Sequence, residues 1–319
     1  MSRAAGIHLD VPFEDYIADA LADAPSLNAG TADTLIAECP RAAWYGHARL
    51  NPAGPGKKTK AQDIGTICHA ILLEGDASKV AVIDPQDYPG AKGAIPRGWT
   101  TTAIKEARDT ARAAGKVPVL KDDFANIEAM VEAAQAFIKG SEIADIWPHS
   151  DREATLLWCE PGIWLRSRPD ALSKDRLIVV DVKSTTGSAN PDAWGRTQIE
   201  GHNELQAALG VRGLRALLPG LRADPRYVWL VIEQQAPFLC SLVAPDPAAM
   251  ALASDKLSAA IDLWRACLKS GKWPGYGNRI AWIAPPAWAM ARWEERATAG
   301  WERRGSEFTQ DELAAGIPL

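Results

Sequence analysis

The sequence lacks paired cysteines with metal-binding spacing, and it lacks long apolar runs. Its five cysteines are scattered singly along 319 residues, with no C-x-x-C pair. A zinc or iron–sulfur framework is therefore not expected, and reduced thiols are. No run approaches the roughly 18 apolar residues that a membrane span requires. The N-terminal residues also lack the apolar core of a signal peptide, so we expect a cytoplasmic protein.

Tyrosine and phenylalanine are scarce, with five each, whereas tryptophan occurs 13 times. Tryptophan can stack on nucleic-acid bases, but packing inside the protein is its commoner use. Positive charge is also in short supply, because the net charge is −5 and the pI is about 5.6. A protein that coats nucleic acid is usually basic overall. The negative net charge therefore argues mildly against nucleic-acid binding, but it does not exclude a local basic channel in an acidic enzyme.

The pattern of helix and strand signals predicts one α+β domain over residues 1–319, with helices around a central mixed β-sheet. Residues 1–150 form a mainly helical N-terminal part, residues 151–245 the central sheet with one helix, and residues 246–319 C-terminal helices. Helices are expected at 11–23, 31–48, 58–75, 101–115, 122–140, 192–217 and 246–270, with a final helix in the tryptophan-rich tail. Strands are expected at 153–159, 163–168, 177–183, 227–233 and 238–243. The first three strands should form an antiparallel meander.

Two acids and a lysine end neighbouring predicted strands in the middle of the chain. Asp170 follows Arg-Pro in RSRPDAL, and Asp181 and Lys183 lie eleven and thirteen residues further on in LIVVDVK. Side chains in a strand alternate between faces, so Asp181 and Lys183 should point the same way while Val182 points into the core. Burying an acid and an amine in an apolar strand is costly without partners.

A divalent cation would explain this arrangement. Two close carboxylates repel each other, and one takes up a proton unless a cation lies between them. Mg²⁺ typically uses one or two carboxylates together with water and substrate phosphate. Lys183 could hold the attacking water, help to deprotonate it, or offset charge that develops on phosphorus. The alternative is a plain salt bridge at a strand end, since short motifs are only hypotheses.

An ordered set of further motifs resembles the exodeoxyribonuclease VIII (RecE-like) family of phage and prophage recombination systems, within the PD-(D/E)XK nuclease superfamily. The resemblance implies a restriction-endonuclease-like α+β fold. It also implies a Mg²⁺-dependent enzyme, with Mn²⁺ as a substitute, that acts without ATP. The chain accordingly has no G-x-x-x-x-G-K-[ST] loop. The similar blocks are AECPRAAWY at 37–45, GTICHAILLE at 65–74, the acid Glu153, R-P-D at 168–170, DVKST at 181–185, HNELQ at 202–206 and WPGY at 273–276.

The resemblance assigns roles to further residues. It implies that His69, Asp170 and Asp181 surround the metal and that Val182 contributes its backbone carbonyl. Glu153 would be an upstream acid of the site. The later helix would carry the catalytic-site residue Gln206. The family motif continues as Q-x-x-x-Y, but Gly210 stands where the tyrosine is expected, which leaves the positioning of the DNA strand open.

His69, Glu153 and Gln206 each also have a plainer interpretation, in which the residue has no catalytic role. A lone helical histidine is often structural, but Gly65 and Thr66 lie one turn before His69 and would let this helix approach the sheet closely. Glu153 could ligate through water, orient His69 or simply be solvated. Gln206 shares a helical stripe with Gln198 and His202, which could equally be a solvated face.

The resulting hypothesis is a DNA exonuclease that degrades the 5′ strand of linear duplex DNA by in-line attack of water, with Lys183 beside the nucleophile. Double-stranded DNA ends, a single-strand annealing protein and a homo-oligomeric ring are the implied partners and assembly. Two alternatives stay open. One is an endonuclease or a nuclease module of a repair complex; its iron–sulfur relatives need clustered C-terminal cysteines, which this chain lacks. The other is a non-catalytic scaffold that binds DNA ends.

Overall fold

The computed structural model describes residues 2–54, 60–75, 77–200 and 203–298. Contacts within the chain divide it into two compact units, Met1–Gly275 and Tyr276–Leu319. The first unit holds the β-sheets and every predicted site residue. In the second unit, the described residues form helix α10 (Ala287–Thr298). No helix in the described part of the chain is long and apolar enough to cross a membrane.

The central sheet is mixed and has the strand order β11-β10-β9-β8-β5, which confirms the predicted fold class. Its two longest strands, β9 and β10, run parallel, and its other neighbouring strands pair antiparallel. Valine and isoleucine dominate β9 and β10, as expected for strands that are covered on both faces. The strands are β5 (Asp151–Arg152), β8 (Ala171–Leu172), β9 (Ile178–Thr185), β10 (Arg226–Glu233) and β11 (Cys240–Val243).

A second, four-stranded sheet has the order β1-β6-β7-β2, and the predicted antiparallel meander is wrong. Strands β6 and β7 form a hairpin in this sheet, whereas β9 belongs to the central sheet. Pro169 lies along the chain between β7 and β8. Proline has no N–H to donate to a neighbouring strand, so strand pairing stops there and the chain passes from one sheet to the other. The strands are β1 (Gly6–His8), β2 (Ser26–Leu27), β6 (Thr155–Glu160) and β7 (Ile163–Ser167), with a separate parallel pair β3 (Val80–Ile83) and β4 (Val117–Leu120).

The helices follow the predicted segments, but two long predicted helices are split. The segment 31–48 breaks where Pro40 begins a new helix, and the segment 192–217 is divided between α7 and α8. The helix predicted at 11–23 is only a short α1. The helices of the first unit are α1 (Phe13–Ile17), α2 (Ala29–Ala37), α3 (Pro40–Gly46), α4 (Lys60–His69) continued by a π-helical turn (Ala70–Glu74), α5 (Thr102–Ala113), α6 (Lys121–Lys139), α7 (Pro191–Glu200), α8 (Asn203–Leu217) and α9 (Pro247–Ser270), with 3-10 turns at Pro85–Asp87, Ala91–Gly93 and Trp147–His149.

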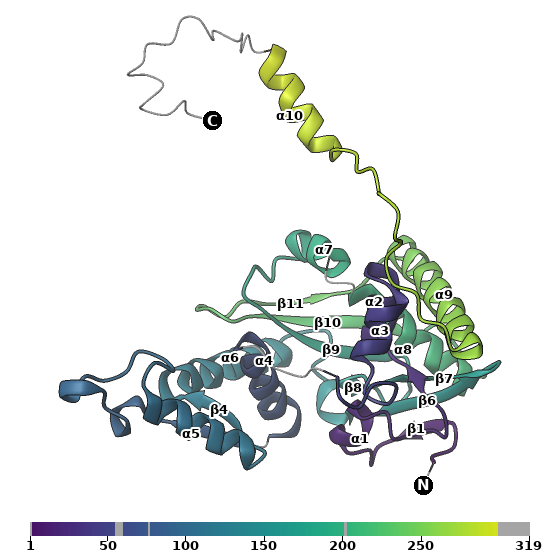
Figure 1. Ribbon diagram of the computed structural model, residues 1–319. Coiled ribbons are helices and arrows are strands. Elements are labelled where there is room, and N and C mark those ends of the chain that lie inside the picture. The colour runs from purple at the N-terminus through teal and green to yellow at the C-terminus, as the bar shows by residue number, and fades with distance from the viewer. Residues whose placement is uncertain (1, 55–59, 76, 201–202, 299–319) are drawn as a thin grey trace, which may run out of the picture. The chain divides into compact units, whose positions relative to one another are not determined.

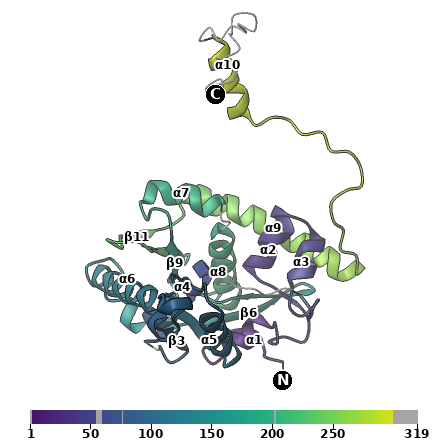
Figure 2. The same cartoon turned by 60° about the vertical axis from the view of Figure 1, so that its left-hand side comes forward.

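Two hydrophobic cores cover the two faces of the central sheet. Val180 and Val182 of β9 pack with α4 and α6, whereas Val179 packs with α2, α8 and α9 on the other face. This alternation is the period of two that a strand imposes. In Figures 1 and 2, α4, α5 and α6 gather beside β9 with the small β3–β4 pair, and α2 and α3 lie along α9. The site residues of β9 therefore lie between two packed helical layers.

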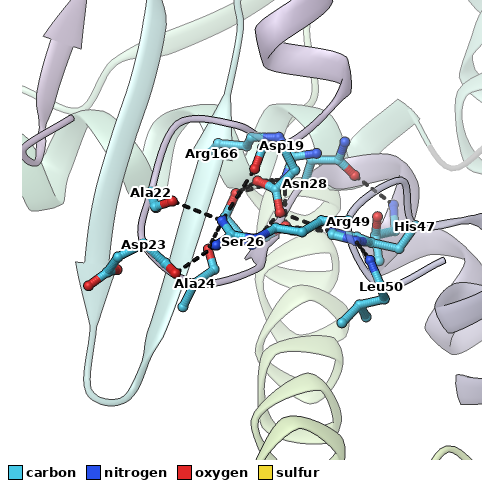
Figure 3. Close-up of polar contacts among 11 residues, drawn as sticks. Asp19, Ala22, Asp23, Ala24, Ser26, Asn28, His47, Arg49, Leu50 and Arg166 are labelled. Atoms are coloured by element: carbon cyan, nitrogen blue, oxygen red, sulfur yellow. Dashed lines mark hydrogen bonds and ion pairs between the residues drawn. The ribbon is translucent and has the colours of Figure 1, made fainter. Parts of the chain in front are cut away.

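A buried ionic network fixes strand β7 to the N-terminal segment (Figure 3). Arg166 Nη1 donates to Asp19 Oδ1 at 2.8 Å, and the backbone nitrogen of Ser26 donates to Asp19 Oδ2 at 2.8 Å. His47 lies beside the same carboxylate, and burial lowers the pKa of its imidazole, so Arg166 supplies the balancing charge. All four side chains are almost fully buried. The network holds β7 firmly just before the chain reaches Asp170.

Candidate active site

A cavity of about 930 Å³ opens beside strand β9. Residues from α4, from the segment before β6, from the β7–β8 connection, from β9 and from α8 meet in its wall. The structure therefore brings all seven predicted site residues together, although their individual roles stay predictions. They are His69, Glu153, Asp170, Asp181, Val182, Lys183 and Gln206.

One group in the cavity consists of an imidazole and two carboxylates. His69 Nε2 lies 2.9 Å from Asp170 Oδ2, and His69 Nδ1 lies 3.5 Å from Glu153 Oε1. A second contact to Asp170 Oδ2 comes from the backbone nitrogen of Val182, which donates at 2.6 Å. One potential ligand atom from each of His69, Glu153 and Asp170 lies within 4.8 Å of the others. Such a cluster of oxygen and nitrogen donors suits a divalent cation.

The second group consists of Asp181, Lys183 and Gln206. Lys183 Nζ lies 2.6 Å from Asp181 Oδ2 and donates to Gln206 Oε1 at 2.8 Å. Gln206 Nε2 in turn donates to Asp181 Oδ1 at 2.6 Å. Each of the three residues thus contacts the other two. Asp181 and Lys183 share one face of β9 as the sequence predicted, and Val182 packs into the core on the other.

Burial and neighbouring charges shift the pKa values of the two acids Asp170 and Asp181 in opposite directions. Burial raises the pKa of Asp170, but the charges of His69 and Lys183 outweigh it and bring this pKa below its ordinary value. For Asp181, burial and the charge of Asp170 prevail over Lys183 and raise the pKa to about 6. One acid is therefore stabilised as an anion and the other is easily protonated, the pattern expected of neighbouring carboxylates.

The two basic groups of the site are both held as cations. Burial lowers the pKa of His69, but the negative charges of Asp170 and Glu153 outweigh this and raise it to about 9. Burial likewise opposes the charge of Lys183, yet Asp181 and Asp170 raise its pKa above the ordinary value. A divalent cation that binds through the imidazole would therefore displace a proton from His69.

Helix α4 reaches β9 closely because it carries Gly65. A Cβ atom at Gly65 would lie 3.2 Å from Ser184 Oγ, which is tighter than ordinary packing. The predicted close approach of this helix is therefore confirmed. One turn further on, the same helix delivers His69 to Asp170. The glycine thus sets the distance between the imidazole and the acids of the sheet.

Position 210, where the family motif has a tyrosine, is a glycine whose side-chain space is filled by the ring of Tyr227 from β10. A Cβ atom at Gly210 would lie 3.1 Å from Tyr227 Cε2, so a side chain there would collide with this ring. Tyr227 is 2% exposed, and burial together with the charge of Asp181 raises the pKa of its hydroxyl well above the ordinary value. The sequence analysis missed Tyr227, whose only signal was a hydroxyl-bearing aromatic in the strand YVWLVIE.

Gln234 was also missed. It follows β10, lines the cavity, and donates from Nε2 to Ser184 Oγ at 3.0 Å. No sequence signal marked it, because Gln234 and its partner Ser184 are 50 positions apart in the sequence. Of the predicted polar stripe on the helix after β9, Gln198 is buried and Gln206 reaches the cavity. His202 lies outside the described residues.

The residues present fit a divalent metal ion. Besides the cluster of His69, Glu153 and Asp170, Oδ2 of Asp181 is buried and accepts no hydrogen bond within the described part of the chain. Lys183 Nζ lies 2.6 Å from this oxygen, and the buried hydroxyl of Tyr227 also lies near the carboxylate. A buried carboxylate oxygen with a free lone pair next to a cluster of oxygen donors is suited to a hard cation.

The mixed sheet with two acids and a lysine at the cavity is the architecture of PD-(D/E)XK nucleases. Residues 34–284 match the model of a family described as a PDDEXK-like domain of unknown function (DUF3799), so the chain belongs to this family. Membership supports a nuclease that uses a divalent metal. Among curated proteins, none matches the chain.

The fold is similar to that of a candidate exonuclease from Eubacterium rectale. The TM-score is 0.54 at 11% identity, over 88% of this chain and 98% of the other. A phage-related exonuclease from Haemophilus somnus overlaps with a TM-score of 0.29 at 12% identity, over 54% of this chain and 90% of that one. An alkaline exonuclease from Laribacter hongkongensis gives 0.26 at 14%, over 54% and 86%. The first likeness supports the fold; the other two are too weak to carry an argument.

Proposed function

We propose that this protein is a divalent-metal-dependent exonuclease that hydrolyses phosphodiester bonds from the ends of linear double-stranded DNA. The observation that carries the proposal is the meeting of Asp170, Asp181 and Lys183 in the wall of one cavity. Membership of the PDDEXK-like family supports phosphodiester hydrolysis. The resemblance to phage-type exonucleases supports action from an end, with 5′-to-3′ polarity and no need for ATP.

In this proposal, His69, Glu153, Asp170 and Asp181 are the residues that would hold the cation, which we take to be Mg²⁺ or Mn²⁺. The backbone carbonyl of Val182 is a further candidate ligand. When bound, such a cation polarises the phosphodiester and lowers the pKa of a water molecule.

Lys183 would stabilise the negative charge that develops on the phosphoryl oxygens. Its neighbours Asp181 and Asp170 keep it protonated, so it is a hydrogen-bond donor and a positive charge rather than a base in this arrangement. Gln206 fixes both partners of the Lys183–Asp181 pair through its amide group. The positions of the acid and the amine are therefore set before the substrate arrives, as electrostatic stabilisation requires.

Digestion of linear duplex DNA, labelled at one 5′ end or at one 3′ end, tests the proposal. With Mg²⁺ we expect early release of the 5′ label, no release with EDTA, and an intact covalently closed circle. Cleavage of the circle would favour the endonuclease alternative instead. Action in phage-type recombination, a ring-shaped homo-oligomer and a single-strand annealing partner rest on the resemblance alone and extend the same proposal.

Lys183→Ala tests whether the site is catalytic. We expect nucleotide release to fall at least about 100-fold, the effect of losing one preorganised charge-stabilising group. Lys256→Ala is the matched control, because Lys256 is a half-buried lysine paired with Glu204 Oε1 at 2.8 Å away from the cavity. Equal nucleotide release by the Lys183→Ala variant and the wild type would refute the catalytic role of the site. The non-catalytic DNA-binding scaffold would then be the remaining hypothesis.

A further inference from the structure

Arg168 lies next to the cavity, directly after strand β7, and all of its guanidinium nitrogens are engaged. Nε and Nη2 donate to Glu153 Oε2 at 2.8 and 2.5 Å. Nη1 donates to the backbone oxygen of Val11 at 2.9 Å and to Thr155 Oγ1 at 3.0 Å. The side chain is 11% exposed. A planar guanidinium with this many bonds is held in a single orientation.

The N-terminal segment 11–16 covers the same guanidinium. The central carbon of the Arg168 guanidinium lies 5.9 Å from the ring centre of Phe13 and 5.7 Å from that of Tyr16. Both aromatic residues also line the cavity. Arg168 therefore ties a segment at the start of the chain to the acids of the candidate active site.

Glu153 is constrained both through its side chain and through its backbone. Both bonds from Arg168 end on one carboxylate oxygen, Oε2, while Oε1 lies 3.5 Å from His69 Nδ1. The backbone of Glu153 has a φ of +50°, which is rare for a residue other than glycine. Its N–H donates to the backbone oxygen of Asp170 at 3.0 Å. Such strained conformations persist where the surroundings determine them, and they gather at functional sites.

We propose that Arg168 is a positioning residue for the metal site, which rests on the proposed function of that site. By binding Oε2, Arg168 leaves Oε1 of Glu153 as the one oxygen presented to His69 and to the cation. Partners of this kind orient the groups that bind a metal, and their loss typically lowers metal affinity about 10- to 100-fold. The N-terminal segment takes part because it fixes Arg168.

The competing role for Arg168 is simple charge balance among the carboxylates. The two roles predict opposite results. If only the charge matters, Arg168→Lys should bind metal like the wild type, and Arg168→Met should bind it more tightly because a nearby positive charge is gone. If Arg168 positions Glu153, both variants should bind metal more weakly, since lysine cannot make the two-nitrogen contact to Oε2.

Calorimetry of Mn²⁺ binding to the full chain without DNA distinguishes these roles. We expect Arg168→Lys to weaken binding at least about tenfold. Arg212→Lys is the matched control, since Arg212 also binds a glutamate through Nε and Nη2, at 2.6 and 2.7 Å from Glu160, and neither residue lines the cavity. It should lower the unfolding temperature without changing the affinity for Mn²⁺. In a Glu153→Gln background, Arg168→Lys should cause little further loss, because it acts through Glu153.

Wild-type affinity in Arg168→Lys, or full additivity with Glu153→Gln, would overturn the inference. If Arg168→Lys does not fold, Thr155→Val replaces it, because this variant keeps the shape and removes only the acceptor of one Arg168 bond. A loss of roughly two- to tenfold in Mn²⁺ affinity is then expected, as for one hydrogen bond, and no loss would overturn the inference. Absence of Mn²⁺ binding by the wild type would instead refute the proposed function itself.

Discussion

Gln206 Nε2 on helix α8 lies 2.6 Å from Asp181 Oδ1 on strand β9, and the two residues are 25 positions apart in the sequence. The other end of the same amide accepts a hydrogen bond from Lys183. A side-chain amide is suited to this place because it can donate to the acid and accept from the amine at once.

Gln206→Met should therefore lower nuclease activity about 10- to 100-fold while the fold persists, because the pair loses its orienting partner. Gln206→Glu should be at least as damaging, since it places a further negative charge directly beside the carboxylate of Asp181. Steady-state rates on linear duplex DNA, with circular dichroism as a folding check, measure this. Gln198→Met on α7 is the control, as Gln198 does not line the cavity. Equal rates for wild type and Gln206→Met would show that the amide has no orienting role.

His69 should make the metal-free protein less stable as the pH rises from about 6.5 to about 9. Its folded-state pKa of about 9 lies above the ordinary unfolded value of 6.5. The native state thus binds more protons in this window, so the stabilisation is complete below pH 6.5 and is lost by about pH 9. We expect an effect on the order of 2 kcal/mol. Chemical denaturation between pH 6 and 9.5 measures it.

The matched variant for this pH dependence is His69→Gln, whose stability should be flatter over the same range. Mn²⁺ affinity of the wild type should rise between pH 7 and 9, because the cation competes with the imidazole proton. A wild-type stability curve parallel to that of His69→Gln would refute the ion pair with Asp170 in solution.

Gly65→Val should destabilise the protein by about 1–3 kcal/mol, the usual cost of overpacking, and should also impair nucleotide release. The physical reason is the 3.2 Å approach of its Cβ position to Ser184 Oγ, which would push α4 and His69 away from β9. Gly46→Ala is the control, since a Cβ atom there meets nothing within 4 Å. Thermal unfolding and activity are measured together. Normal values of both for Gly65→Val would contradict the tight contact.

Asp19→Ala should destabilise the fold by about 3–5 kcal/mol, because it leaves Arg166 as an unpaired buried charge. The exposed pair of Arg3 and Asp10 supplies the control, and Asp10→Ala should cause no measurable loss. Urea unfolding of both variants checks the difference, and equal midpoints would show that the buried network contributes nothing.

Most element types, and the set of polar residues that meet in the cavity, were predictable from the sequence. The alternation in LIVVDVK identified a strand with Asp181 and Lys183 on one face, and the pair Gly65 and His69 indicated a helix that closely approaches a sheet. These features follow from local periodicity and residue size, which act within a few residues along the chain. The ordered motifs, from the early C-P to the late W-P-G-Y, indicated the PD-(D/E)XK superfamily, which agrees with the PDDEXK-like family model that the chain matches.

The sheet arrangement was not predictable in the same way. Pro169 lies along the chain between β7 and β8, which belong to different sheets, and long-range pairing places β9 beside β10 and β8 instead of beside β7. Whether a strand continues one sheet or enters another depends on which apolar faces find each other, and this is a property of the assembled core. The antiparallel meander therefore failed as a prediction, although each of its strands is present.

The amino-acid sequence alone determined which chemical groups this protein possesses and which local faces they occupy, because both depend on residue type and backbone period. Only the tertiary structure decided that Tyr227 fills the space beside Gly210, that Gln206 bridges Asp181 and Lys183, and that Arg168 grips Glu153. Such contacts join residues far apart in the chain, and they exist only where packing of the two cores brings their backbones within reach.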